Sequence, residues 1–110
     1  KGLQPEPGNP LVINNSDESF TGTGFLFHPS DTFRKKDLMQ YFSSLRAVRI
    51  KGILHTDDGW LLIQQSSGII TAEQTNPEGQ SRLEIIFHTM QLEKEETLKT
   101  AILGCILHGS

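Results

Sequence analysis

The sequence predicts an α+β fold, a two-layer sandwich in which a mostly antiparallel sheet carries two helices on one face. Residues 48–65 alternate apolar and polar side chains on both sides of the turn dipeptide Asp58-Gly59, which is typical of a β-hairpin. Residues 38–45 and 98–105 instead repeat apolar side chains at helical spacing. A hairpin with an amphipathic segment on either side of it points to a sheet covered by helices.

Residues 1–19 are predicted to be a linker that leads into a domain spanning residues 20–110, because prolines and glycines recur through them. Leu11, Val12 and Ile13 could instead add a short edge strand. Since the chain starts at Lys1 and not at methionine, we expect it to be part of a longer protein.

Residues 20–27 are predicted to form the first strand of the domain, in which Gly22 and Gly24 mark a bulge or a close backbone approach. These glycines complete no phosphate-binding motif. A helix follows, and its buried stripe is expected to be Leu38, Tyr41, Phe42 and Leu45. Its first turn is basic, with Arg34, Lys35 and Lys36 forming either a solvated surface or a docking site for an acidic partner.

The hairpin at residues 48–65 is expected to have Asp58 and Gly59 as its two loop residues, so that Asp57 opposes Trp60. One face then points to the core and carries Val48, Ile50, Leu54, Leu61 and Ile63. The other carries Arg49, Lys51, Ile53, His55, Trp60 and Leu62. Large apolar groups mixed with cations are unusual for a surface that meets only water.

Five residues of that second face are therefore our candidates for an interface: Arg49, Lys51, Ile53, Trp60 and Leu62. A tryptophan beside cations is a common energetic centre of protein interfaces. The alternative is that Arg49 and Lys51 only form ion pairs with Glu84 of a neighbouring strand.

The rest of the chain predicts two more strands and a last helix. Residues 68–73 form the third strand of a meander, and residues 82–88 form a strand with Leu83, Ile85 and Phe87 facing inward. The last helix starts near Leu92 and stops at Gly109. Its buried stripe is expected to be Leu98, Ala101, Ile102 and Cys105. The order β-α-β-β-β-β-α, with a right-handed first connection, gives a ferredoxin-like arrangement with one sheet face left open.

Composition narrows the class of protein. A length of 110 residues suits one domain, and a net charge of -3 argues against a nucleic-acid-binding protein. A single cysteine cannot form a disulfide within the chain, which favours a reducing, cytoplasmic location. No apolar run approaches the length of a membrane span, so we expect no membrane partner.

No set of residues predicts catalysis in this chain. Cys105 is expected to be buried, and no carboxylate pair or Ser-His-Asp set stands out. His28 and His55 end strands that run in the same direction, so both lie at one edge of the sheet, with Asp57 or Asp58 as an oxygen ligand. They are weak candidates for a labile metal contact, since isolated histidines at strand ends are usually just exposed.

The chain resembles the C-terminal domain of the CobW family of P-loop GTPase metallochaperones and cobalamin-biosynthesis proteins. The resemblance rests on the run Arg49-Ile50-Lys51-Gly52 followed by apolar residues, on Gly59-Trp60, and on the S-R-L-E-I-I run of residues 81–86. Phe33 and Leu38 at the first helix and Cys105 in the last one also fit.

The resemblance implies a parent protein with an N-terminal GTPase domain that uses GTP, Mg²⁺ and zinc or cobalt, none of which this chain has motifs to hold. It also implies that this module has a non-catalytic role in recognising the GTPase domain or a client metalloprotein. The alternative is a free-standing small-ligand or metal-sensing domain that dimerises through its open sheet face.

Overall fold

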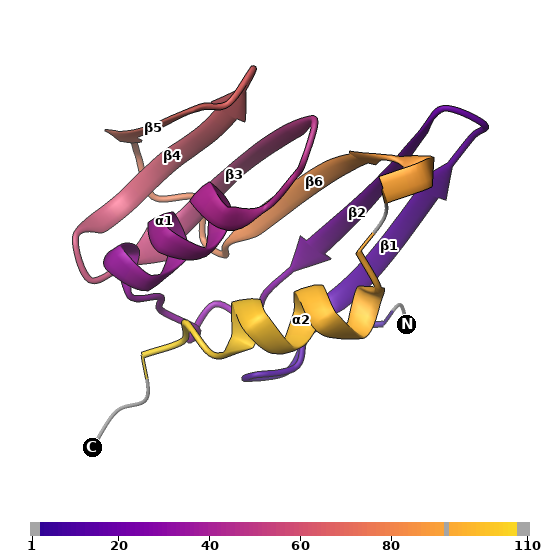
Figure 1. Ribbon diagram of the computed structural model, residues 1–110. Helices are drawn as coiled ribbons and strands as arrows, with labels where there is room; N and C mark the ends of the chain where they lie inside the picture. Colours follow the sequence, from indigo (N-terminus) through magenta and orange to yellow (C-terminus); the bar gives the residue numbers. More distant parts are fainter. Residues whose placement is uncertain (1–2, 92, 108–110) are drawn as a thin grey trace.

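The computed structural model describes residues 3–91 and 93–107. It is an α+β fold in which a six-stranded sheet has both helices on one face (Figure 1). The elements are β1 (Leu11–Ser16), β2 (Phe20–Leu26), α1 (Lys35–Ser44), β3 (Arg49–Thr56), β4 (Gly59–Ser66), β5 (Ile69–Gln74), β6 (Arg82–His88), the short 3₁₀ helix η1 (Thr89–Gln91) and α2 (Glu95–Leu103). The predicted fold class is confirmed.

The strands lie in the order β1-β2-β6-β3-β4-β5, and each neighbouring pair is antiparallel. Since β2 and β3 both run antiparallel to β6, they point the same way and β6 fills the place between them. The sequence predicted the common direction of these two strands correctly.

The sheet has an edge strand where the sequence favoured a linker, and the alternative of an edge strand at Leu11, Val12 and Ile13 is confirmed. Residues 11–16, which lie within the predicted linker, form β1 and pair with β2 from Leu11 opposite Leu26 to Ser16 opposite Thr21. Side chains hold this edge strand as well, because Thr23 Oγ1 donates a 3.0 Å hydrogen bond to Asn14 Oδ1, and Asn14 Nδ2 donates one of 2.6 Å to Glu95.

The predicted register of the β3-β4 hairpin is wrong by two residues. Trp60 opposes His55 instead of Asp57, and the turn residues are Asp57 and Asp58. Thr56 closes this turn: its hydroxyl accepts a 3.0 Å hydrogen bond from the Asp58 N–H and donates one of 2.7 Å to the Gly59 carbonyl. A shift of two residues leaves every side chain on its predicted face.

The core lies between the sheet and the two helices. Its fully buried side chains come from both layers: Phe27, Phe33, Leu38, Phe42, Ile50, Leu54, Ile63, Ile85, Phe87, Leu98 and Ile102. The predicted inward strand residues are confirmed, and in the helical stripes Leu38, Phe42, Leu98 and Ile102 are buried. Cys105 is buried as well, but it lies just past the end of α2 and not in the helix as predicted. Tyr41, Leu45 and Ala101 are half-buried at the margin, and Val48 precedes β3.

The last helix is shorter than predicted. It begins at Glu95 and ends at Leu103, where Gly104 follows. Leu92 and Gly109, the predicted limits, lie outside the described residues. In the part of the chain that the structure covers, neither helix has the length and apolar character that crossing a bilayer requires.

Tyr41 gives a pH-dependent prediction, because burial, followed by the nearby Glu93 carboxylate, raises the pKa of its phenol to about 12. Its Oη is buried without a hydrogen-bond partner among the described residues. The ordinary pKa of tyrosine is about 10. Between these two pKa values the unfolded chain loses the phenolic proton while the folded chain keeps it. The free energy of unfolding is therefore unaffected by this group below about pH 10 and falls as the pH rises toward 12.

Tyr41 is the only tyrosine, so absorbance of the phenolate reports on it alone. We expect the native chain to titrate near pH 12 and the urea-unfolded chain near 10. Equal midpoints in the two states would show that Tyr41 is not buried as described.

Candidate interaction surface

The open face is the side of the sheet opposite α1 and α2, and all five predicted interface residues lie on it. Arg49 and Lys51 are exposed there, whereas Ile53, Trp60 and Leu62 are half-buried. Ile53 and Leu62 lie directly opposite each other on β3 and β4. Both described helices lie on the other side of the sheet (Figure 1). That these residues share one face is confirmed, and their role in an interface stays a prediction.

The two cations of β3 form no ion pair with the described carboxylates. Lys51 lies directly opposite Glu84 in the sheet, yet the ion pairs of the described residues are Arg34–Asp37, Lys35–Asp58 and Arg82–Glu78. The simple alternative, in which Glu84 neutralises Arg49 and Lys51, is therefore not what this structure shows. Their charges remain available to a partner.

Trp60 is held by the residue that the corrected register places opposite it. The His55 imidazole stacks on the indole with a ring separation of 4.8 Å and an interplanar angle of 11°. His55 Nδ1 also lies 3.3 Å from the Thr32 hydroxyl, which fixes the imidazole ring in turn. The sequence missed this stack because it placed Asp57 opposite Trp60.

A groove of about 520 Å³ crosses β2, β6 and β3 on the open face. The side chains around it come from four strands: Ile13, Leu26, Lys51, Ile53, Arg82 and Glu84. Gly24 lies in it, on the open side of β2, and the ladders on both sides of β2 run without a bulge. The sequence singled out Gly22 and Gly24, but the groove also depends on β1, which the sequence offered only as an alternative to a linker.

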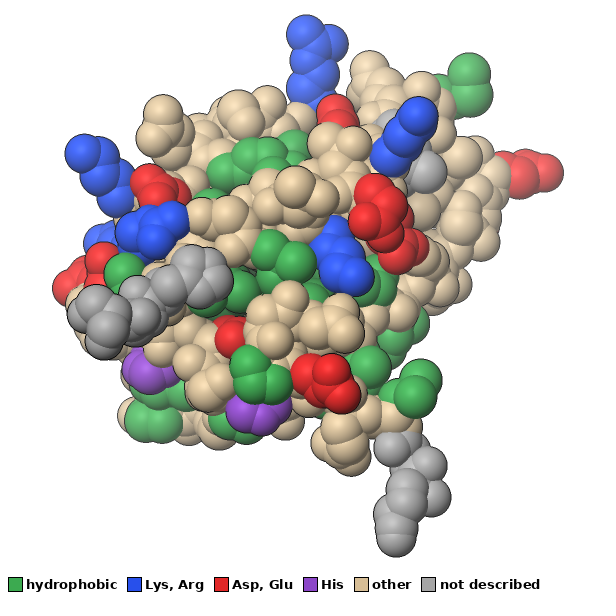
Figure 2. Space-filling model, turned by 90° about the horizontal axis from the view of Figure 1, so that it is seen from below, with side chains coloured by type: hydrophobic (Ala, Val, Ile, Leu, Met, Phe, Trp, Pro, Cys, Tyr) green, Lys and Arg blue, Asp and Glu red, His purple; other side chains and the backbone are tan. Residues whose placement is uncertain are grey.

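The predicted histidine pair, His28 and His55, lies at the end of the sheet where β2 and β3 finish. His88 ends β6 and therefore lies at the opposite end of the sheet. Figure 2 faces the end of the molecule where β2 and β3 finish, and it shows histidine side chains there among apolar and acidic ones. His28 Nδ1 accepts a 3.1 Å hydrogen bond from the Ser30 N–H, so its lone pair is already used.

The proposed oxygen ligands near these histidines are used within the fold. Asp57 accepts a 2.9 Å hydrogen bond from the Lys35 N–H at the start of α1, and Asp58 pairs with Lys35 Nζ at 3.2 Å. Within residues 3–91 and 93–107, no three His, Cys, Asp or Glu side chains are grouped to hold a metal ion. Metal binding by His28 and His55 stays an untested prediction.

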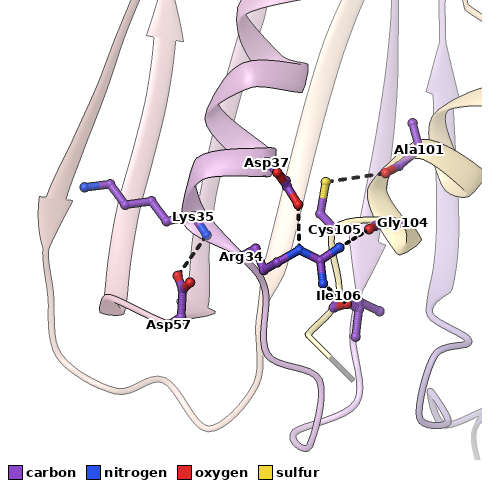
Figure 3. Close-up of polar contacts among 8 residues, drawn as sticks. All are labelled: Arg34, Lys35, Asp37, Asp57, Ala101, Gly104, Cys105 and Ile106. Carbon is purple, nitrogen blue, oxygen red and sulfur yellow. Dashed lines mark hydrogen bonds and ion pairs between the residues drawn. The ribbon is translucent and has the colours of Figure 1, made fainter. Parts of the chain in front are cut away.

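Arg34, at the basic start of α1, connects the two helices (Figure 3). Its guanidinium pairs with Asp37 and donates to the carbonyls of Gly104 and Ile106, at 2.6 and 3.1 Å, just past the end of α2. The hydrogen bond to Asp37 raises the pKa of Arg34. These donors satisfy the carbonyl of Gly104 at the C-cap of α2 and that of Ile106 in the segment after it, which gives Arg34 a structural role.

Cys105 has no features of a nucleophile. It is buried as predicted, and its Sγ donates to the Ala101 carbonyl at 3.5 Å (Figure 3). Burial raises the pKa of its thiol, which disfavours the reactive thiolate.

A family model described as the cobalamin synthesis protein cobW C-terminal domain matches residues 23–106. No curated protein and no solved structure matches the chain. The match includes the two strands that carry the interface candidates, and it identifies no catalytic domain.

Proposed function

Because this chain belongs to the family of CobW C-terminal domains, we propose that it is a non-catalytic module that recognises the CobW-family GTPase region and is coupled to it. GTP, Mg²⁺ and zinc or cobalt then belong to that region. A client metalloprotein is a further partner of the same module. The proposal places the protein in the cytoplasm, which agrees with its single cysteine.

The observation that carries this proposal is the composition of the open face. It combines a half-buried tryptophan and aliphatic side chains with two cations that have no ion pair among the described residues. Tryptophan and arginine are enriched in protein interfaces, and buried aromatic residues supply much of the affinity. Coupling to a GTPase requires such a contact, because a module shifts the conformational equilibrium of another domain only if it binds one conformation of that domain more tightly than the other.

The test is to titrate the purified CobW-family GTPase region into this chain by calorimetry. We expect association, and we expect Trp60→Ala to weaken it by about 2 kcal/mol, or roughly thirtyfold. Met90→Ala is the control, because Met90 is 94% exposed and lies in η1, beyond the end of β6. No association with the wild-type chain, together with an unchanged GTPase rate, would contradict the proposal.

A second candidate function is that of a small-ligand sensor that dimerises through the open face. The groove favours it, because the volume of the groove lies in the range of small-molecule binding sites. This alternative predicts a stable dimer in light scattering and a higher melting temperature with ligand. A monomer that binds the GTPase region would rule it out.

A further inference from the structure

The groove on the open face exists because a glycine interrupts a row of side chains. Strand register places Ile13, Gly24, Glu84 and Lys51 side by side on β1, β2, β6 and β3. Three of these positions project side chains from the open face, and Gly24 projects none. The groove therefore occupies the space between Ile13 and Glu84 that a side chain at position 24 would fill, and the backbone of β2 forms its floor.

The walls of the groove are apolar at two sides. Ile13 is 67% exposed and stands along one of them, although β1 is an edge strand that could have placed a polar residue there. Leu26 and Ile53 are half-buried and lie one row along the strands. A partner side chain placed over Gly24 would thus remove apolar surface of three strands from water, which is the main source of association energy.

The charges at the rim favour an acidic neighbour for that side chain. Lys51 forms no ion pair with the described residues, whereas Arg82 forms one with Glu78 at 3.2 Å. The Glu84 carboxylate turns toward Gly22, since its Oε2 lies 3.5 Å from where a Gly22 Cβ would stand. The rim next to Lys51 is therefore positive.

We propose that the groove above Gly24 receives a large apolar side chain of the CobW-family GTPase region, with an acidic residue beside it that pairs with Lys51. This inference rests on the proposed function and adds the contact point and its chemistry. A partner segment with an apolar anchor next to a carboxylate complements both the hollow and its rim.

The test is the substitution Gly24→Val, which places a side chain on the floor of the groove and so occupies the space proposed for the partner's side chain. A Cβ at Gly24 would stand 3.6 Å from the Ile13 carbonyl oxygen and 3.9 Å from that of Leu83, which are ordinary contacts. A β-branched residue also suits a strand, so the variant is expected to fold. Its affinity for the GTPase region should fall at least about tenfold.

The matched control is Gly22→Val, which adds the same side chain to the same strand and face but outside the groove. Its Cβ would meet the flexible end of Glu84 at 3.5 Å. We expect its affinity to stay within about twofold of the wild type, as for contacts at an interface margin. Thermal melts of both variants verify folding.

A second variant, Lys51→Glu, tests the charge without touching the groove floor, and Lys51 is exposed enough for the change to leave the fold intact. We expect at least about tenfold weaker binding, with less loss at high salt. Wild-type affinity in both Gly24→Val and Lys51→Glu would overturn this inference and leave the proposed function standing. Equal losses in Gly22→Val and Gly24→Val would also overturn it. Failure of the wild-type chain to bind would overturn the proposed function itself.

Discussion

Replacing Phe33 with alanine is expected to lower the free energy of unfolding by about 4 kcal/mol, the usual cost of removing a fully buried phenylalanine ring. Phe33 has no exposed surface, and its ring meets that of Phe27 edge to face at 4.9 Å. Its backbone also donates to the His55 carbonyl and accepts from Asp57, both at 2.9 Å. The cavity would thus open where the start of α1 meets β3.

Urea denaturation measures this effect, and Phe20→Ala is the control with the same chemical change. Phe20 is 42% exposed at the start of β2, and its ring lies 5.2 Å from the His88 ring. We expect it to cost about 1 kcal/mol or less, because part of its surface is already in water. Equal losses in the two variants would contradict the described core.

Gly52→Ala is expected to destabilise the fold by about 2 kcal/mol through overpacking. A Cβ at Gly52 would stand 2.9 Å from the Arg82 carbonyl oxygen, 3.0 Å from Leu83 Cδ1 and 3.2 Å from Leu54 Cδ1. Because β3 is paired on both sides, its backbone cannot move away without straining two ladders. This crowding gives a physical reason for the glycine that ends the Arg49-Ile50-Lys51-Gly52 run.

Gly24→Ala is the control for Gly52→Ala, since it adds the same methyl group to a strand glycine that has room for it. Its effect on the urea midpoint should be within about 0.5 kcal/mol. If Gly52→Ala were as well tolerated as Gly24→Ala, the close approach of β3 and β6 would be wrong.

The sequence predicted which face each side chain of the β3-β4 hairpin occupies, because alternation along a strand determines the face directly. It could not predict the hairpin register, since shifts by two residues leave that alternation unchanged. The register depends on the Thr56 hydroxyl in the turn and on Asp57, whose carboxylate accepts from the Lys35 N–H of α1. The second of these contacts joins residues 22 positions apart, which no local pattern reveals.

The groove was missed, and β1 was predicted only as a short alternative at residues 11–13, for a related reason. Asn14 and Asn15 have low strand propensity, yet they pair with β2, and Asn14 also donates to the side chain of Glu95. The groove then requires β1, β2, β6 and β3 in that order. Strand order is a property of the whole chain, and the same is true of the contacts that Arg34 makes with the end of α2.

The central claim is that the open face contacts the CobW-family GTPase region, and Trp60 reports on it directly as the only tryptophan. The measurement is a nuclear magnetic resonance titration of this chain, isotope-labelled, with the unlabelled GTPase region. We predict that the indole N–H signal of Trp60 and the backbone signals of Lys51, Ile53 and Leu62 shift or broaden together, while those of α1 and α2 change little. Changes confined to the two helices, with the Trp60 signal unmoved, would contradict the claim.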